Sequence, residues 1–365
     1  MASPWNPPPP ADHRARRDRL RTTLADTADV VVISDLINVR YLTGFTGSNA
    51  AVLVSATDPA ADRICTDGRY ITQVAEQAGD LEAVIARNCL GALVEYAGRA
   101  GAVRVGFEEH IVTVAAHRDL DGALVGTSGL VERLREVKDA GEVALLRRAC
   151  AVADEALAAI IERGLLAPGR TEREVARALE WEMFERGADA VSFETIVAAG
   201  ANSAVPHHRP TTAVLADGDF VKIDFGAAVA GYHSDMTRTY VLGHAADWQR
   251  EIYDLVSAAQ SAGRAALTPG AGLRAVDGAA RSVIAAAGYG DRYVHGLGHG
   301  IGLQIHEAPG IGSAAAGTLP CGAAVTVEPG VYLPGRGGVR IEDSLVVTDG
   351  EPDLLTTTDK TFTVI

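Results

Sequence analysis

The stretch Phe220-Val-Lys-Ile-Asp-Phe-Gly-Ala-Ala-Val-Ala-Gly-Tyr-His-Ser-Asp-Met-Thr-Arg-Thr-Tyr-Val241 contains two β-branched, apolar runs on either side of Ala230-Gly231. This pattern predicts two strands joined by a tight turn. Asp224 lies in the first run and Asp235 begins the second. If the turn centres between residues 229 and 230, the two acids face one another with Cβ atoms about 4.5–5.5 Å apart. Two carboxylates at this distance repel one another unless a proton or a cation lies between them. In the alternative interpretation, one acid caps a turn and the other is exposed to solvent.

Two further acids occur in apolar, strand-like runs. Ala324-Val-Thr-Val-Glu-Pro-Gly330 places Glu328 at the end of one run, and Gly338-Val-Arg-Ile-Glu-Asp-Ser-Leu-Val-Val347 places Glu342 inside another. A carboxylate in an apolar strand is rarely buried unless it is paired or binds a metal. Each Glu taken alone fits a structural role, but four acids in the same context indicate one shared site.

A glycine-rich segment adds three histidines. In Tyr293-Val-His-Gly-Leu-Gly-His-Gly-Ile-Gly-Leu-Gln-Ile-His-Glu307, the imidazoles belong to His295, His299 and His306. The interleaved glycines disfavour a helix, and the pattern is neither H-E-x-x-H nor G-x-G-x-x-G. The segment instead predicts a backbone that approaches a site closely and presents imidazoles to it.

Four carboxylates with one or two imidazoles form an oxygen-rich set that suits Mn²⁺, Co²⁺ or Zn²⁺. Four buried negative charges are balanced by two divalent ions but not by one. Two metals about 3.5–4 Å apart hold a bridging water as hydroxide and polarise a carbonyl. The sequence therefore predicts metal-assisted hydrolysis of an amide or ester.

Composition excludes several classes of protein. The formal net charge of −14 argues against a surface that binds nucleic acid or an anionic membrane, and no apolar run reaches the length of a membrane span. The N-terminus lacks the apolar stretch of a signal peptide. Four dispersed cysteines without a C-x-x-C pair favour a reducing cytoplasm and exclude a cysteine-built metal site.

The length of 365 residues suggests two domains. We expect a flexible, Pro-rich tail over residues 1–17, a small α/β domain over 18–130 and an α+β catalytic domain over 131–365. In the second domain, Asp139-Ala-Gly-Glu142 and Thr171-Glu-Arg-Glu174 have the spacing of capping boxes and predict the start of two helices. Two more helices are expected at about 247–267 and 272–287.

The motifs together resemble the pita-bread metallopeptidases. The resemblance is carried by the two acids of the hairpin, His295-Gly-Leu-Gly-His-Gly-Ile-Gly302, Val327-Glu-Pro-Gly330 and Arg340-Ile-Glu-Asp343. Within that group the chain is similar to the proline-specific branch of Xaa-Pro dipeptidases (prolidases) and Xaa-Pro aminopeptidases. Asn38-Val-Arg-Tyr-Leu-Thr-Gly-Phe-Thr-Gly-Ser-Asn49 is similar to their first, creatinase-N-like domain. The resemblance therefore implies a creatinase-N-like domain followed by a pita-bread domain.

The resemblance also implies a ligand set for two divalent ions, with Mn²⁺ expected and Co²⁺ or Zn²⁺ as alternatives. Asp235 and Glu342 would bridge both ions, Asp224 would hold one, and His299 and Glu328 the other. The implied ligands are Asp224, Asp235, His299, Glu328 and Glu342.

Further residues receive catalytic roles from the resemblance. Glu328 would also take the proton of the attacking water and pass it to the leaving nitrogen. His207 would contact substrate, His295 would line the site, and His306 would stabilise the oxyanion. Arg340 would pair with an acid of the site and orient Glu342. Tyr332 is expected near the metals, whereas His208 and His233 receive no role.

The implied substrate is a small peptide with proline as its second residue, and dipeptidase and aminopeptidase activity both remain open. A homodimer is expected, in which the N-terminal domain helps to close the site. The alternatives are a metal-free, creatinase-like amidinohydrolase, a methionine aminopeptidase and a non-catalytic pita-bread binding module. All five ligand positions carry metal-competent side chains, which argues against the amidinohydrolase and the binding module. The large first domain argues against a methionine aminopeptidase.

Overall fold

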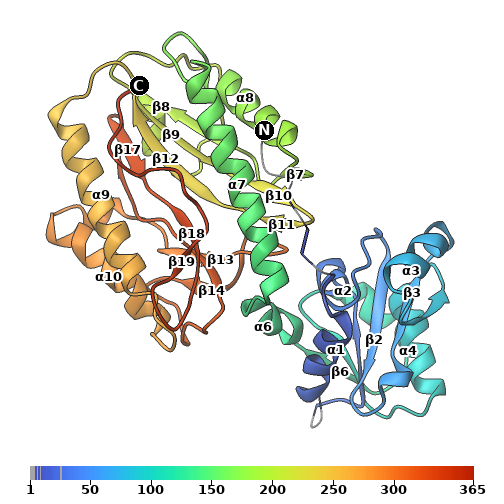
Figure 1. Ribbon diagram of the computed structural model, residues 1–365. Helices are drawn as coiled ribbons and strands as arrows, with labels where there is room; N and C mark the ends of the chain where they lie inside the picture. The colour runs from blue at the N-terminus through green and yellow to red at the C-terminus, as the bar shows by residue number, and fades with distance from the viewer. Residues whose placement is uncertain (1–4, 6, 9, 25–26) are drawn as a thin grey trace. The chain divides into compact units, whose positions relative to one another are not determined.

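The computed structural model describes residues 5, 7–8, 10–24 and 27–365. The chain divides into two compact units (Figure 1). The N-terminal unit is Pro10–Arg135, and the C-terminal unit contains Glu136–Ile365. None of the helices in these described ranges combines the length and apolar composition needed to cross a membrane.

A six-stranded sheet forms the centre of the N-terminal unit, in the order β4-β3-β2-β1-β5-β6. Its buried strand β1 pairs antiparallel with β2 and parallel with β5, so a continuous β-branched run suits it. The strands are β1 (Val30–Ile33), β2 (Ala50–Ser55), β3 (Arg63–Thr66), β4 (Glu82–Ile85), β5 (Val105–Glu108) and β6 (Leu124–Thr127). The helices are α1 (His13–Thr22), α2 (Leu36–Thr43), α3 (Ile71–Gln77), α4 (Cys89–Arg99), α5 (Val114–Arg118) and α6 (Leu130–Glu136). The predicted α/β domain is confirmed.

Helix α1 corrects the expected N-terminal tail. Arg16 and Arg17 are buried, and their guanidinium groups donate to the carbonyl oxygens of Tyr41 and Leu42 at 3.1 and 2.9 Å. These carbonyls lie in the last turn of α2, where the helix dipole favours cations. Residues 13–17 are therefore part of the fold, although a basic run usually stays solvated. Residues 1–4, 6 and 9 of the expected tail lie outside the described residues.

The boundary between the units lies between Arg135 and Glu136 rather than after residue 130. Arg135 donates to Asn38 Oδ1 at 2.7 Å, which holds the end of α6 in the N-terminal unit. The turn signal at residues 127–129 precedes α6, so the composition change marks the beginning of this helix and not the end of the unit.

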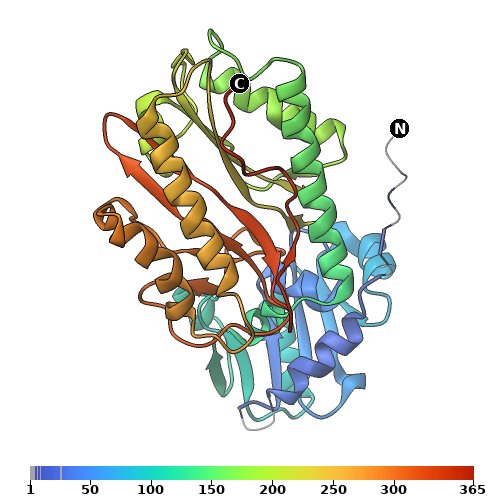
Figure 2. The same ribbon diagram turned by 60° about the vertical axis from the view of Figure 1, so that its left-hand side comes forward.

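The C-terminal unit has two halves, each with a pair of helices on a set of strands (Figures 1 and 2). In the first half, α7 (Ala140–Glu162) and α8 (Glu172–Glu185) share a core with β8, β9 and β12, and both begin with the predicted capping boxes. The strand order there is β12-β9-β8, beside a small β11-β10-β7 sheet. The strands are β7 (Ala190–Val191), β8 (Ile196–Ala199), β9 (Phe220–Phe225), β10 (Ala227–Val229), β11 (Tyr232–His233) and β12 (Met236–Val241).

In the second half, α9 (Asp247–Ala265) and α10 (Leu273–Ala286) share a second core with the C-terminal strands, as predicted. These strands form a sheet of order β14-β13-β15-β18-β19 and a β16–β17 pair. Their bounds are β13 (Gly298–Gly300), β14 (Glu307–Ile311), β15 (Ala324–Val327), β16 (Gly330–Leu333), β17 (Gly337–Arg340), β18 (Asp343–Val346) and β19 (Asp353–Leu354). Two helix pairs, each packed on its own set of strands, confirm the α+β prediction for this unit.

Candidate metal centre

The hairpin of β9 and β12 supplies two of the predicted acids. Thr237, not Asp235, lies opposite Asp224 in the register. The turn centres between Ala230 and Gly231, and both residues have positive φ. This centre is one residue later than the one, between residues 229 and 230, that would place the two acids face to face. Asp235 is therefore diagonal to Asp224, and the predicted direct opposition is wrong. The two acids still share a face of the hairpin because side chains two positions apart point the same way.

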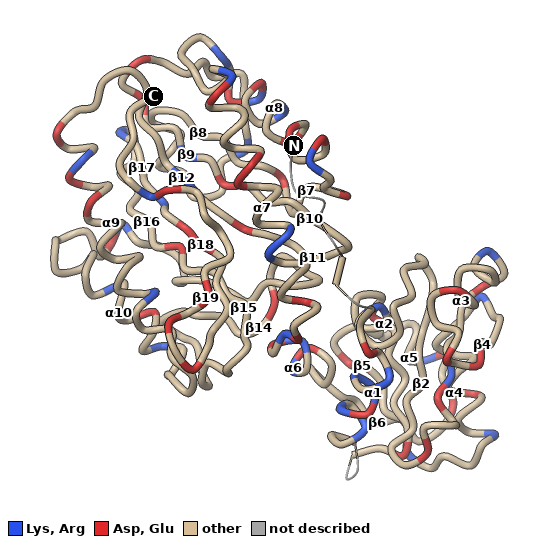
Figure 3. The backbone as a smooth tube through the Cα atoms, in the orientation of Figure 1, with Lys and Arg blue, Asp and Glu red and all other residues tan. Residues whose placement is uncertain are grey.

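The second half supplies the other three ligand candidates. His299 lies in β13, Glu328 follows β15, and Glu342 connects β17 to β18. The backbone N–H of Glu342 donates to the carbonyl of Thr237 at 3.1 Å, which joins this strand to the β12 strand of the first half. Acidic residues of this unit therefore lie on strands as well as on helices (Figure 3).

Strand β13 depends on glycine for its position. A Cβ on Gly298 would lie 2.0 Å from the carbonyl oxygen of Thr326 in the adjacent strand. The glycine therefore allows close approach of two backbones, and His299 Nδ1 and the His299 backbone are held there. The segment forms no helix, as its glycine content predicts, and Gly298–Gly300 within it is a short strand.

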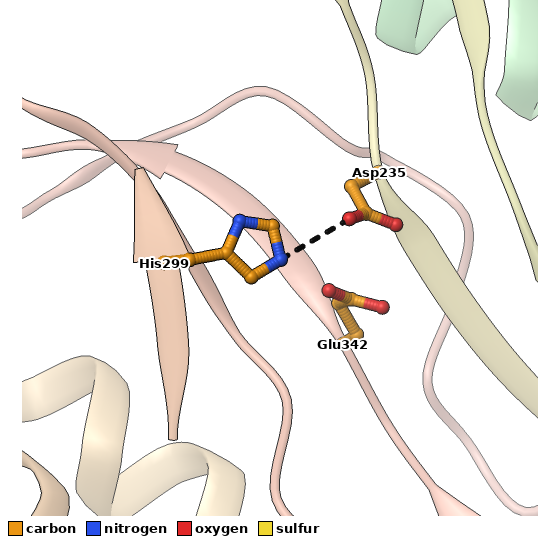
Figure 4. Close-up of side chains that lie close together, drawn as sticks. All are labelled: Asp235, His299 and Glu342. Atoms are coloured by element: carbon orange, nitrogen blue, oxygen red, sulfur yellow. Dashed lines mark ion pairs between the residues drawn. The ribbon is translucent and has the colours of Figure 1, made fainter. Parts of the chain in front are cut away.

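Asp235, His299 and Glu342 form one close group (Figure 4). Each offers a ligand atom, and these atoms all lie within 4.8 Å of one another. His299 Nε2 is 3.5 Å from Asp235 Oδ2 and 3.7 Å from Glu328 Oε1. These separations exceed hydrogen-bond length but fit ligand atoms around a cation, whose bonds to nitrogen and oxygen are about 2.0–2.2 Å.

The tautomer of His299 supports this interpretation. Its Nδ1 lies 3.0 Å from the carbonyl oxygen of Gly300, which can only accept a hydrogen bond. In the neutral ring the proton is therefore on Nδ1, and Nε2 presents a lone pair to the carboxylate oxygens of Asp235 and Glu328. Atoms that all carry lone pairs require a proton or a cation between them. A neutral imidazole held by its other nitrogen is the usual form of a metal ligand.

The acids themselves are short of positive charge. Burial raises the pKa of Asp235, Glu328 and Glu342, and neighbouring carboxylates add to the rise; the pKa of Glu328 reaches about 7. Among the described residues, Arg340 is the one permanent cation that pairs with the four ligand acids: its guanidinium pairs with Asp224, and its Nε lies 3.9 Å from Glu328 Oε2. Asp224 Oδ1 is buried and has no hydrogen-bond partner. The donor set therefore fits divalent metal ions, which supply the missing charge and ligand bonds.

Arg340 is hydrogen-bonded to side chains on several strands of the site. Its guanidinium pairs with Asp224, and its Nε donates to Thr237 Oγ1 at 3.0 Å. The Thr237 hydroxyl in turn donates to Glu342 Oε2 at 2.7 Å. The predicted pairing of Arg340 with an acid is thus present, and its path to Glu342 runs through Thr237. The i, i+2 spacing from Asp235 to Thr237 was the available sequence signal for this residue.

His295 is held by both ring nitrogens. Nδ1 lies 2.8 Å from the carbonyl oxygen of Gly296, so it carries the proton, and Nε2 accepts from the Tyr332 hydroxyl at 2.8 Å. Tyr332 also accepts a hydrogen bond from Arg340 at 2.8 Å. Burial lowers the pKa of His295 to about 4, in agreement with a neutral ring. Arg340, Tyr332 and His295 therefore form a hydrogen-bonded chain along the wall of the site.

The remaining two histidines face the cavity more freely. The ring of His306 lies edge-on to that of His299 with centroids 4.4 Å apart. His207 follows the 3₁₀ turn Gly200–Ala204, and its side chain is exposed. Burial lowers the pKa of both imidazoles, so both favour the neutral form at neutral pH.

All nine predicted site residues line a single cavity of about 440 Å³ in the C-terminal unit. They are His207, Asp224, Asp235, His295, His299, His306, Glu328, Arg340 and Glu342. His208, which received no role from the sequence, also lines it and pairs with the buried Glu172 at 2.8 Å. Further lining residues that the sequence did not single out are Phe193, Glu194, Ile196, Arg209 and Ile305.

Two family models match the chain. The Creatinase/Prolidase N-terminal domain matches residues 16–137, and the model of metallopeptidase family M24 matches residues 144–349. These ranges coincide closely with the two compact units. The creatinase-N-like and pita-bread domains that the motifs imply are therefore confirmed.

Known proteins resemble the chain over nearly its whole length. An uncharacterized peptidase of Bacillus subtilis is 38% identical over 346 residues, which cover 92% of this chain and 96% of that protein. The structure of an Xaa-Pro dipeptidase from Bacillus anthracis superposes with a TM-score of 0.92 at 37% identity, covering 97% of this chain and 100% of the other. For an X-Pro aminopeptidase from Thermotoga maritima the TM-score is 0.86 at 31% identity, with 96% and 99% covered. The chain belongs to metallopeptidase family M24.

Proposed function

We propose that this metallopeptidase hydrolyses the bond between a first residue and a proline, in Xaa-Pro dipeptides or at the N-terminus of longer peptides. The observation that carries the proposal is the cavity into which the four ligand carboxylates and His299 converge, with Arg340 as the permanent cation that pairs with these acids. Support for the substrate comes from the solved relatives of Bacillus anthracis and Thermotoga maritima, which are described as an Xaa-Pro dipeptidase and an X-Pro aminopeptidase.

Five residues would hold two divalent ions, with Mn²⁺ expected and Co²⁺ or Zn²⁺ as alternatives. Asp235 and Glu342 would contribute to both ions, Asp224 to one, and His299 and Glu328 to the other. The close group of Asp235, His299 and Glu342 supports this assignment, as does the unpartnered Oδ1 of Asp224. When bound, the ions supply an activated water and polarise the scissile carbonyl.

The side chains would divide the proton transfer and the stabilisation of charge between them. Glu328 takes the proton from the attacking water and delivers it to the prolyl nitrogen, because its carboxylate lines the cavity beside His299. His306 would donate a hydrogen bond to the developing oxyanion, and His207 would contact the substrate. Arg340, Thr237 and Tyr332 hold the acids and His295 in place.

Proline requires a dedicated site for a chemical reason. A prolyl nitrogen carries no N–H, so an enzyme cannot hold the bond through that donor. The leaving nitrogen of the tertiary amide must also be protonated, and Glu328 would deliver this proton.

Hydrolysis of three matched peptides tests the proposal. We expect the Mn²⁺-loaded chain to cleave an Xaa-Pro dipeptide or an Xaa-Pro-Yaa tripeptide, and to leave the corresponding Xaa-Ala peptide almost intact. The ratio of the two Xaa-Pro rates decides between dipeptidase and aminopeptidase. Equal cleavage of the Xaa-Ala peptide, or none of either Xaa-Pro peptide, would contradict the proposal.

We also propose a homodimer located in the cytoplasm. The dimer is supported by the resemblance to proline-specific pita-bread enzymes, and the location by the dispersed, unpaired cysteines. Light scattering that finds a monomer at micromolar concentration would contradict the dimer.

A further inference from the structure

The side chain of His207 lies on a loop, and the surrounding side chains do not fix its position. In the described part of the chain, no hydrogen bond, ion pair or ring contact holds the imidazole of His207, and the side chain is exposed to the cavity. Its position therefore depends on the backbone of the loop. This backbone belongs to no helix or strand, since it follows the 3₁₀ turn that ends at Ala204.

A buried lysine holds the two peptide groups that precede His207. Lys222 is 0% exposed and lies in β9, two residues before Asp224 and on the same face. Its Nζ donates to the carbonyl oxygens of Val205 at 2.6 Å and Pro206 at 3.1 Å. A buried amino group is costly unless acceptors satisfy its N–H groups, so these two bonds favour the closed position of the loop.

Two further buried charges hold the loop on either side of His207. Arg340, which pairs with Asp224, also donates to the Pro206 carbonyl at 3.1 Å. Beyond His207, the fully buried Glu172 accepts hydrogen bonds from His208 and from the backbone and side chain of Thr211. The loop is thus held by the donors of Lys222 and Arg340 before His207 and by the acceptor Glu172 after it.

Lys222 also contacts the wall of the site. Its ammonium lies 5.0 Å from the ring centroid of Tyr332, which bonds to Arg340 and His295. The strand that carries Asp224 therefore carries a second group, whose bonds run to the His207 loop. One rigid strand sets the relative position of a metal-ligand candidate and a substrate-contacting histidine.

We propose that Lys222 is a positioning residue for His207, which fixes the histidine through the Val205 and Pro206 carbonyls. This role rests on the proposed function, because His207 acts there on the peptide substrate. Displacement of a catalytic group by about 1 Å costs on the order of 10²-fold in rate. Loss of the Lys222 bonds therefore reduces turnover without removing any metal ligand.

Three variants separate positioning from loss of stability. In Lys222→Met, which keeps the length of the side chain but has no donor, we expect kcat to fall by about 10–100-fold with unchanged metal content. Lys222→Arg retains donors and restores part of the activity. The control is Ile284→Ala, a buried position in α10 away from the site, which lowers the melting temperature but leaves kcat unchanged. If Lys222→Met does not fold, Lys222→Gln takes its place: its side chain is shorter, so its amide N–H groups no longer reach the two carbonyls, and the same fall in kcat is expected.

A double-mutant cycle shows whether Lys222 acts through His207. In a His207→Ala background, Lys222→Met should change kcat by less than about twofold, because the group it positions is already absent. Full additivity of the two effects would place the action of Lys222 elsewhere and overturn the proposal.

Amide hydrogen exchange tests the same proposal without any activity. In Lys222→Met, we expect faster exchange at the amides of Val205 and Thr211, whose N–H groups donate to Asn202 and Glu172, and unchanged exchange in α10. In Ile284→Ala, we expect faster exchange in α10 and unchanged exchange at these two amides. Unchanged exchange at Val205 and Thr211 in Lys222→Met overturns the positioning role. A wild-type chain that cleaves no Xaa-Pro peptide overturns the proposed function instead, so the two failures are distinguishable.

Discussion

Two adjacent acids, Glu342 and Asp343, lie in regions of opposite electrostatic character. Asp343 is fully buried and accepts hydrogen bonds from Arg238 at 2.9 Å, Gln260 at 2.8 Å and Thr356 at 3.0 Å, besides an ion pair with Lys360. Burial alone would raise the pKa of Asp343, but Arg238 and Lys360 outweigh it and hold the pKa below its ordinary value.

Glu342 is also buried but lies among acids. Thr237 donates to its side chain, while burial and the neighbouring Asp235 raise its pKa well above the ordinary value. Burial of an acid is therefore no mark of a functional site by itself. The mark is burial without enough donors, because this arrangement is stable only when something else brings positive charge.

Removal of metal should have the largest effect on activity. If it had no effect, the contrast between Glu342, which has too few donors, and Asp343, which has enough, would not mark a metal centre. We expect dialysis against a chelator to abolish Xaa-Pro hydrolysis and Mn²⁺ or Co²⁺ to restore it. The melting temperature should fall on chelation, because ions that bind only the folded chain stabilise it. Full activity in protein shown by elemental analysis to be metal-free would refute the metal centre.

Substitution of the acids on the two sides of the comparison should separate metal loss from instability. Asp235→Asn and Glu342→Gln should lose bound metal and nearly all activity. Asp343→Asn should retain metal but lose about 3–5 kcal/mol of stability, because Arg238 and Lys360 are left without their partner. Elemental analysis measures the bound metal, and thermal unfolding measures the stability. If only Asp343→Asn lost metal, the assignment of Asp235 and Glu342 as ligands and of Asp343 as a structural acid would be wrong.

The imidazoles should show a third behaviour. We expect His306→Ala to retain metal and to lose about 10²–10³-fold in kcat, as for removal of an oxyanion donor. His207→Ala should likewise retain metal and lose turnover. If His306→Ala emptied the metal centre, the division between ligands and substrate-facing groups would be wrong.

Thr237→Val removes the hydroxyl that links Arg340 to Glu342 while keeping the shape of the side chain. Loss of a group that orients a ligand costs about 10–100-fold in metal affinity. Metal titration of the chelated variant measures this effect. The matched control is Thr239→Val on the same strand, because the Thr239 hydroxyl donates to the backbone carbonyl of Arg340 and makes no bond to its guanidinium or to Glu342. Equal affinity in Thr237→Val and the wild type would show that Arg340 orients Glu342 by another path.

The smallest effect should come from Glu172, a buried acid with ample donors. Burial raises its pKa, but hydrogen bonds from Ala199, Asn202, His208 and Thr211 outweigh this and hold the pKa below its ordinary value. A depressed pKa stabilises the fold above the unfolded-state pKa of about 4.3, and this stability is lost as the pH falls through the folded-state pKa. We expect Glu172→Gln to cost about 2 kcal/mol at pH 7 and the difference from wild type to shrink below about pH 4. A difference that stays constant down to pH 3 would contradict this sign.

The local patterns of the chain predict much of its fold. The capping boxes at Asp139 and Thr171 locate the starts of α7 and α8, because a cap is satisfied by residues three positions apart. The β-branched runs likewise predict β9 and β12, and the glycine-rich segment predicts a non-helical backbone where β13 lies. Buried arginines in α1 escaped prediction because their partners, Tyr41 and Leu42, are distant in sequence.

The sequence by itself determined the chemical inventory of the site, since four acids and His299 in apolar or glycine-rich runs already require positive charge. Only the tertiary structure decided which buried acid is left short of donors. Nothing in Arg340-Ile-Glu-Asp343 shows that Glu342 would lie among carboxylates and Asp343 among cations. A turn centred one residue later likewise made Asp235 diagonal to Asp224. The physical reason is that charge balance is a property of neighbours in space, and these neighbours come from strands far apart in the chain.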